Sequence, residues 1–280
     1  MSKAEEQLSL DTFRKRGEEI SNAAGVRDTM HEYFFASAPR LWRSLRLFDL
    51  IDSDLGDVLE IGPFFGYVPF ALRCRASSYT VLEGRDPVVE PLMELYRERD
   101  IACSYIDFFD RFGPVREATH CLDLKSDSLD RILCWETMEH FGFNPVKFVR
   151  ELLRVLRPGG SACITVPNSA SFQNLVGLAT GRGEQHKIDG YFAHEDYECN
   201  GRKAFYGFHW REYTTSELRR LFERAGFEVR SSGSFTAFQD RESIGLARRL
   251  ARGASSAASA LLPRFGPNAY IWARKPDVSG

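Results

Sequence analysis

Short apolar segments alternate with longer amphipathic segments from Asp57 onward, and this alternation restricts the fold more than any other feature of the sequence. Strands separated by helices pair in parallel, because each crossover helix returns the chain to the same end of the sheet. The pattern therefore predicts an α/β protein with a mostly parallel sheet and helices on both faces. The apolar segments are 57–61 (DVLEI), 79–83 (YTVLE), 101–106 (IACSYI), 130–135 (DRILCW) and 161–166 (SACITV).

Helix and strand signals continue between and after these segments. Residues 144–156 carry a helical stripe of Val and Leu, and the following RPGG at 157–160 is expected to end the helix and turn into the next strand,. Thr214 and Glu217 fit a capping box at the start of another helix,. Gly226 would end that helix, and strands are expected from Phe227 and over 268–275,.

Two regions interrupt the alternation. Residues 1–50 are expected to form two or three helices, with Leu41, Leu45 and Phe48 at helical spacing,. We interpret them as an N-terminal helical lid on a domain that covers 51–280. Residues 168–213 are rich in Gly, His, Tyr and charge and are too long for a simple connection,. We expect them to form an inserted cap over the edge of the sheet.

Composition and charge limit the partners. The chain has 280 residues, a net charge of −2 and a pI near 6.3, so it has no general attraction for nucleic acid. Six cysteines without a Cys-x-x-Cys pair favour buried thiols in a reducing compartment,. The N-terminus lacks a signal pattern, and no run reaches the roughly 20 apolar residues of a membrane span,. These features predict a cytoplasmic protein without a nucleic-acid partner.

One segment of the tail is compatible with a membrane contact. Arg248, Arg249 and Arg252 lie among leucines, as in a basic amphipathic helix on an anionic membrane,. Such a helix more often packs on its own domain, and Gly253 with many Ser and Ala weakens its apolar face,. We therefore expect the tail to pack on the domain.

The loop after the first apolar segment predicts the type of cofactor. A dinucleotide fingerprint G-x-G-x-x-G would need glycine at 64 and 67, where Phe64 and Tyr67 stand, so NAD and FAD are disfavoured,. Glu60, Gly62 and Gly66 remain, in a turn able to approach a cofactor that lacks a diphosphate. Glu83 ends the next strand about twenty residues later, where a carboxylate can accept both hydroxyls of a ribose. These residues favour a ribose-bearing cofactor without phosphate.

Five motifs occur in an order that resembles the class I S-adenosylmethionine-dependent methyltransferases. This resemblance covers residues from about 55 to 230 and implies S-adenosylmethionine as cofactor and a Rossmann-like seven-stranded sheet. The motifs are VLEIGPFFG (58–66), YTVLEG (79–84), DSLDRILCWETMEHF (127–141), LRPGGSACITVPN (156–168) and YTTSELRRLFERAGFEV (213–229).

The resemblance also implies roles for individual residues. Gly62 and Gly66 would border the methionine end of the cofactor, Glu83 the ribose, and Trp135 the sulfonium. The family usually has a third glycine where Phe64 stands, which makes Phe64 a candidate wall for the methionine portion. Asp107, which ends the third strand, is our choice for the adenine amine, with Asp123 as the alternative. The full predicted cofactor set is Glu60, Gly62, Phe64, Gly66, Glu83, Gly84, Asp107 and Trp135.

His140 is the candidate catalytic base if the acceptor is a hydroxyl, because a histidine with a pKa near ~6.5 is neutral and basic at cellular pH. Related sugar-modifying methyltransferases resemble this chain in placing a base there, although a histidine at this point can also be structural. Tyr206, His209 and Arg211 are the candidate acceptor residues,. No metal site is predicted, since adjacent residues such as His194, Glu195 and Asp196 do not easily converge on one ion,.

The sequence thus predicts an S-adenosylmethionine-dependent methyltransferase that modifies a hydroxyl on a sugar, a glycan precursor or a natural product. Two alternatives belong to other classes. One is a non-catalytic binding module in which Phe64 closes the pocket. The other is a nicotinamide-dependent oxidoreductase, which shares the sheet and the ribose carboxylate but is disfavoured by Phe64 and Tyr67.

Overall fold

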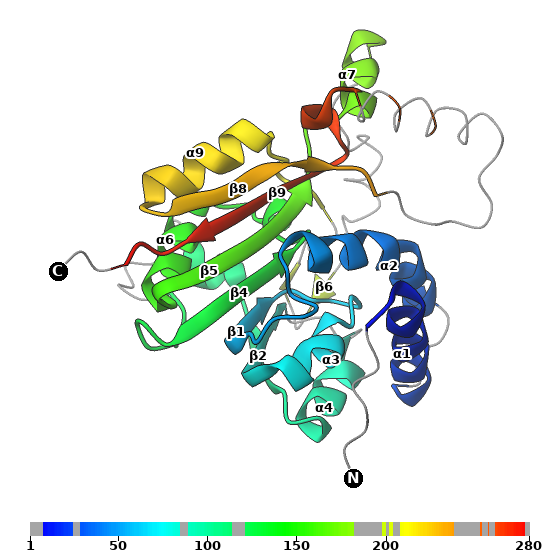
Figure 1. The fold of residues 1–280 in the computed structure, drawn as a ribbon, viewed down its shortest axis with the longest axis vertical. Coiled ribbons are helices and arrows are strands. Elements are labelled where there is room, and N and C mark those ends of the chain that lie inside the picture. The colour runs from blue at the N-terminus through cyan, green and yellow to red at the C-terminus, as the bar shows by residue number, and fades with distance from the viewer. Residues whose placement is uncertain are drawn as a thin grey trace.

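The computed structural model is built around one seven-stranded sheet (Figure 1). It describes residues 8–24, 29–84, 89–113, 121–181, 198–199, 202–203, 208–237, 253, 257 and 261–277. The strands of the sheet are β1 (Gly56–Ile61), β2 (Ala76–Gly84), β3 (Ala102–Ile106), β4 (Leu129–Trp135), β5 (Leu156–Pro167), β8 (Glu228–Phe235) and β9 (Asn268–Arg274). The main helices are α1 (Leu10–Ala23), α2 (Thr29–Leu47), α3 (Val68–Leu72), α4 (Glu90–Glu98), α5 (Phe108–Phe112), α6 (Pro145–Val155), α7 (Phe172–Ala179) and α9 (Thr215–Ala225).

The strand order is β3-β2-β1-β4-β5-β9-β8. The pairs from β3 to β5 are parallel, and β9 runs antiparallel to both of its neighbours. The chain leaves β1 toward β2 and later resumes at β4 on the other side of β1, so the strand order reverses between β1 and β4. Ligands of open parallel sheets bind beyond the carboxyl ends of the strands at such a reversal. The predicted α/β, mostly parallel, seven-stranded sheet is confirmed.

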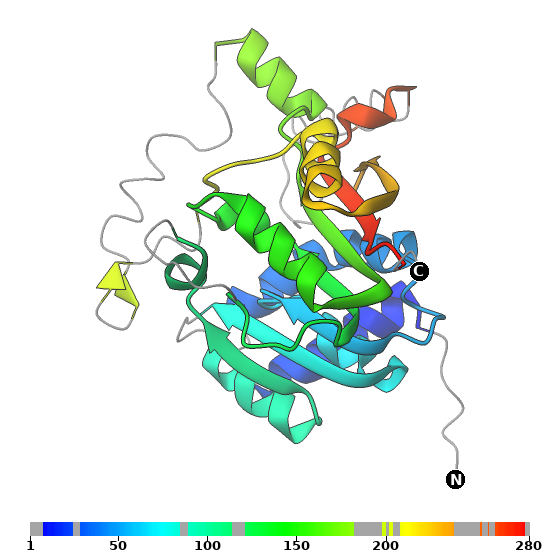
Figure 2. The same ribbon diagram turned by 90° about the vertical axis from the view of Figure 1, so that its left-hand side faces the viewer.

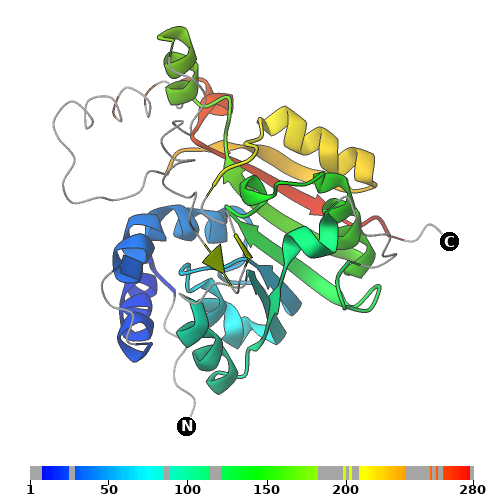
Figure 3. The ribbon, with the colours of Figure 1, turned by 180° about the vertical axis from the view of Figure 1, so that it is seen from behind.

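Each face of the sheet carries its own apolar core. Side chains of consecutive strand residues point to opposite faces, and in β1 this places Val58 in one core and Leu59 in the other. The core that contains Val58 is closed by α1 to α4, and the core that contains Leu59 by α5, α6 and α9. Figures 1 and 3 show the two groups of helices on opposite sides of the sheet. Helices on both faces are therefore confirmed.

The N-terminal residues form two helices that pack on the domain. The rings of Phe13 in α1 and Phe34 in α2 meet edge to face with centroids 5.2 Å apart. The hydroxyl groups of Ser21 and Tyr67 lie 2.9 Å apart and join α1 to the loop after β1. Leu41, Leu45 and Phe48 are buried, as their helical spacing predicts. The role of these helices as a lid stays a prediction.

The sequence predicted the end of α6 less well than the start and the end of α9. The expectation that 157–160 forms a turn was wrong, because α6 ends at Val155 and β5 begins at Leu156. The strand takes in the RPGG residues with an irregular register against β4 and with Gly159 at φ 81°. The capping box of Thr214 and Glu217 is confirmed, and Gly226 ends α9 at φ 104°.

The region predicted as a cap is described only in part. Helix α7 extends away from the sheet (Figures 1 and 2), and the two-residue strands β6 (Glu198–Cys199) and β7 (Arg202–Lys203) pair with each other. The cap itself stays a prediction, and the predicted tail helix with Arg248, Arg249 and Arg252 lies outside the described residues. Within the described residues, no helix has the length and apolar character needed to cross a membrane.

Candidate functional site

The loop after β1 lies at the point where the strand order reverses. Gly62 has a φ of 62°, and a Cβ at this position would lie 2.7 Å from Cγ2 of Thr137, so only glycine fits between this loop and the end of β4. The turn closes where the N–H of Gly66 donates to the carbonyl of Pro63 at 2.8 Å. Phe64 adopts a φ of 47°. The loop therefore has a left-handed backbone at position 64, a conformation that favours glycine.

Glu83 connects this loop to the end of β2. Its side chain is buried, and Oε2 accepts the N–H of Phe64 at 2.8 Å while Oε1 accepts the N–H of Gly84 at 2.9 Å. These bonds hold the carboxylate at the carboxyl end of β2, beside the glycine-bearing loop. A carboxylate in this place is suited to accept the hydroxyls of a ribose bound beyond the strand ends.

Glu60 and Trp135 lie deeper, under the helices of the N-terminal half. The hydroxyl of Tyr79 donates to Oε2 of Glu60, and the ring of Trp135 lies 5.6 Å from that of Phe48, which directly follows α2. Burial raises the pKa of Glu60 to about 8, against the opposing effect of Tyr79 and Trp135. Oε1 of Glu60 and Nε1 of Trp135 make no hydrogen bond of ordinary geometry with a described residue, although the indole lies close enough to lower the pKa of Glu60.

The two candidates for the adenine amine occupy different surroundings. Asp107 directly follows β3, and its Oδ1 accepts the N–H of Asp110 at 2.9 Å. Both carboxylate oxygens of Asp123 accept hydrogen bonds from Arg111, at 3.1 and 2.6 Å, and 78% of its side chain is exposed. Asp107 thus stands at a strand end, where a ligand would bind, whereas Asp123 is paired with α5 at the surface.

An ion pair that sequence reasoning missed connects α2 to the end of β4. Nη1 of Arg40 donates to Oε2 of Glu136 at 3.0 Å, with 12% and 7% of the two side chains exposed. The ring of Tyr33 meets that of Phe64 edge to face at 5.4 Å. Helix α2 therefore lies over the loop after β1 and the turn after β4. No local pattern could have found this pair, because its members are 96 residues apart in the chain.

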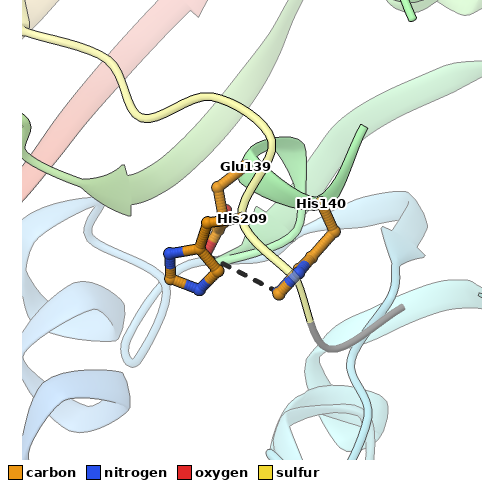
Figure 4. A group of neighbouring side chains, drawn as sticks. All are labelled: Glu139, His140 and His209. Carbon is orange, nitrogen blue, oxygen red and sulfur yellow. Dashed lines mark ion pairs between the residues drawn. The ribbon is translucent and has the colours of Figure 1, made fainter. Parts of the chain in front are cut away.

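The turn after β4 carries the predicted base. Met138–His140 forms a short 3₁₀ helix, and Nδ1–H of His140 donates to the carbonyl of Phe208 at 3.0 Å. Nε2 of His140 lies 3.9 Å from Oε1 of Glu139, and 26% of the histidine side chain is exposed. Figure 4 marks this contact. The imidazole is therefore held by one nitrogen while part of the ring reaches solvent.

A second histidine joins this turn from a distant part of the chain. The N–H of Trp210 donates to the carbonyl of Glu139 at 2.7 Å, which brings the ring of His209 to 4.9 Å from that of His140. Glu139 is almost fully buried, and burial together with the charge of Glu136 raises its pKa well above the usual range. The order Glu139–His140 was a local signal for this cluster, but nothing in the sequence connected it with His209.

Comparisons with known proteins identify the family. The family model described as "Methyltransferase domain" matches residues 31–232. The chain belongs to the class I S-adenosylmethionine-dependent methyltransferases. A Mycolicibacterium smegmatis protein named "Probable S-adenosylmethionine-dependent methyltransferase" is 30% identical over 173 residues, which are 62% of this chain and 52% of that protein. The chain thus spans about half the length of this curated relative.

Solved structures share the fold of this chain. A protein in complex with the Haloferax volcanii Trm112 methyltransferase activator is 17% identical, with a TM-score of 0.53 over 94% of this chain and 97% of that one. An S-adenosylmethionine-dependent methyltransferase from Mesorhizobium loti is 16% identical, with a TM-score of 0.52 over 85% and 97% of the two chains. At these identities the likeness concerns the fold alone.

The residues around the methyltransferase loop fit the cofactor of the family, which is S-adenosylmethionine. Gly62 lets the loop pack closely on Thr137, where a Cβ would not fit, and Glu83 stands at the end of β2. Glu60 and Trp135 are buried near each other, and the indole lowers the pKa of Glu60.

The predicted acceptor residues are only partly brought together. His209 lies beside His140, and its Nδ1–H donates to Oε1 of Glu212 at 2.8 Å. Nη2 of Arg211 instead donates to Oε1 of Glu217 in α9 at 2.9 Å, and its guanidinium lies 5.4 Å from the centre of the Tyr213 ring. Tyr206 falls outside the described residues, as do His186, His194, Glu195 and Asp196.

A hollow of about 620 Å³ opens next to the turn that carries His140. Most of its larger side chains are aromatic, with polar groups among them. Such a surface suits a ring-bearing molecule with polar substituents. The lining residues are Phe112, Phe141, Gly142, Phe143, Asn144, Lys147, Trp210 and Arg211.

Proposed function

We propose that this chain is an S-adenosylmethionine-dependent O-methyltransferase whose acceptor is a hydroxyl of a sugar, a glycan precursor or a natural-product small molecule. The observation that supports it best is the bond from Nδ1–H of His140 to the carbonyl of Phe208. Because a carbonyl oxygen only accepts, the proton of the neutral imidazole is on Nδ1 and the lone pair is on Nε2. In this tautomer His140 can take a proton from an acceptor hydroxyl.

The cofactor residues support the same proposal. S-adenosylmethionine supplies an activated methyl group, so the protein mainly has to align the acceptor and exclude water. Gly62 and Gly66 would allow the loop to approach the methionine end, and Glu83 would accept the ribose hydroxyls. Asp107 would bind the adenine amine. Phe64 would then form a wall, with its ring held against Tyr33 of α2.

Acceptor binding would use the aromatic hollow and the residues around it. The rings of Phe141 and Phe143 stack with centroids 4.7 Å apart and would form an apolar wall of the hollow. Lys147, Asn144 and Trp210 add hydrogen-bond donors to the lining of the hollow,. This combination favours a polar acceptor with a ring or another flat apolar face. His209 would help to orient the hydroxyl next to His140.

Calorimetric titration with S-adenosylmethionine tests the cofactor part of the proposal. We expect saturable binding, weakened about 10- to 100-fold by Glu83→Ala, because charge-assisted bonds contribute about 1.5–3 kcal/mol. Glu98→Ala, an exposed change on α4, is the matched control and should bind as the natural chain does. The absence of binding at millimolar cofactor would favour the non-catalytic module, and NAD binding instead would favour the oxidoreductase.

The base is tested separately through turnover. A panel of sugars, glycan precursors and phenolic compounds would be screened for formation of S-adenosylhomocysteine, and the best acceptor used at saturation. His140→Ala should lower turnover and leave the affinity for S-adenosylmethionine unchanged. Equal turnover in the variant would make His140 a structural residue, and methylation of amines alone would remove the O-methyl assignment.

A further inference from the structure

Glu139, His140 and His209 form a cluster of metal-ligating groups. One ligand atom from each residue lies within 4.8 Å of the other two. Figure 4 shows Glu139 and His140 on the turn after β4, with His209 beside them on the later loop. The backbone bond from Trp210 to Glu139 fixes the two segments relative to each other. The ligands therefore come from two segments of the chain that are already joined.

Both histidines make the outer hydrogen bond that is typical of metal ligands. A metal-bound histidine almost always donates its other ring N–H to a carboxylate or a backbone carbonyl, which fixes the ring and its tautomer. Nδ1–H of His140 donates to the carbonyl of Phe208 at 3.0 Å, and Nδ1–H of His209 donates to Oε1 of Glu212 at 2.8 Å. Each bond leaves the lone pair on Nε2, the atom with which the ring would bind an ion.

The carboxylate of Glu139 is buried, and one of its oxygens lacks a hydrogen-bond donor among the described residues. Glu139 is 1% exposed, and its Oε2 has no hydrogen-bond partner among the described residues. The same holds for Oε1 of Glu136, whose other oxygen is bound by Arg40. Glu136 and Glu139 thus share the guanidinium of Arg40, and Glu212 lies near Glu139. Buried carboxylate oxygens normally have a partner, and a cation at this place would supply one.

We propose that Glu139, His140 and His209 bind a divalent first-row transition metal ion of the zinc type. Two imidazoles and one carboxylate are a donor set of such ions, whereas magnesium and calcium prefer oxygen ligands alone. Three protein ligands leave a fourth position open, as in sites that also bind a substrate oxygen. The assignment of the site does not depend on methyl transfer. When an ion is bound, Nε2 of His140 is a ligand and cannot be the base, so the proposed role of His140 as base belongs to the metal-free chain.

Cobalt(II) is a suitable probe because its visible absorption reports the ligands directly. The purified full chain would be freed of metal with a chelator and titrated with Co²⁺, without S-adenosylmethionine, and Zn²⁺ would then be added as a competitor. We expect one ion per chain with the bands of a nitrogen- and oxygen-ligated site, displaced by Zn²⁺. His209→Ala and Glu139→Gln should abolish these bands. Glu212→Ala, which removes only the outer bond, should weaken binding about 10- to 100-fold.

The controls separate this site from other metal-binding groups. Glu98→Ala removes an exposed carboxylate from α4 and should leave Co²⁺ binding unchanged. Circular dichroism of each variant would confirm that the fold is retained, and Glu212→Ala keeps all three ligands if a ligand variant unfolds. Unchanged binding in His209→Ala, an absence of cobalt bands in the natural chain, or intense thiolate bands from a cysteine would each overturn the proposal. The calorimetric titration with S-adenosylmethionine uses the same metal-free chain. A failure to bind metal can therefore be distinguished from a failure to bind the cofactor.

Discussion

The buried carboxyl group of Glu60 should make the stability of the chain depend on pH. Replacement of Glu60 by glutamine should remove this dependence. Glu60 is fully buried on β1, and burial raises its pKa from the usual 4.5 to about 8. Between these two values the native chain keeps the proton and the unfolded chain releases it. The free energy of unfolding therefore falls as pH rises through this window. Glutamine has nearly the same shape but does not ionise. The free energy of unfolding of Glu60→Gln should therefore not fall in this pH window.

The magnitude follows from the width of the window. Each pH unit in which the two states differ by one proton changes the free energy of unfolding by about 1.4 kcal/mol. From pH 5 to pH 8 the natural chain should thus lose up to about 4 kcal/mol relative to Glu60→Gln. This is an upper bound, because water and polar groups can approach the carboxylate once it ionises. At about 2 °C per kcal/mol for a chain of this size, the melting temperatures should diverge by up to about 8 °C.

Thermal unfolding of both chains at half-unit steps from pH 5 to pH 8 is the assay. Glu228→Gln, an exposed change on β8, serves as the control and should follow the natural chain at every pH. The variant should gain stability relative to the natural chain steadily with rising pH. Parallel curves for the natural chain and Glu60→Gln would refute the reasoning, because they would mean that burial does not perturb Glu60.

Two further substitutions probe the contacts that hold the loop and α2. Gly62→Ala should cost about 1–3 kcal/mol of stability and weaken S-adenosylmethionine binding, because its Cβ would meet Thr137 at a positive φ,. Thr137→Ala in the same chain should recover part of the steric cost, because it removes both Cγ2 and Oγ1, and calorimetry would show this. Arg40→Met should lower the free energy of unfolding by about 3–5 kcal/mol, since it leaves Glu136 buried without its partner,. Adding Glu136→Gln should restore most of it in a melting experiment.

Much of the fold could be predicted because its signals are local. The alternation of apolar runs gave every strand of the parallel part of the sheet, and Thr214 with Glu217 gave the start of α9. The turn expected at 157–160 was wrong because the Gly residues there join β5 through an irregular register. A glycine pair marks a change of backbone conformation, and such a change also fits a bulged strand.

The candidate site could be predicted only where the sheet itself fixes it. Gly62 directly follows β1, and Glu83 lies near the end of β2. The two strands are parallel neighbours, so the topology of the sheet brings these residues together,. Arg40 and His209 reach the site through contacts between segments far apart in the chain, and no spacing rule records such contacts. Arg211 was expected to bind the acceptor. In the structure its side chain donates a hydrogen bond to Glu217 of α9.

The place of Phe64 connects the loop, the ribose carboxylate and α2 in one arrangement. Its N–H donates to Glu83, its ring contacts Tyr33, and its φ is one that glycine adopts without cost,. A non-glycine residue in this conformation persists when its surroundings hold it there, at a cost of about 1–3 kcal/mol. The aromatic contact with α2 is the feature that a glycine could not supply. A glycine at position 64 would form this turn at a lower conformational cost. Phe64 instead contacts α2, so the position of the loop depends on the N-terminal helices.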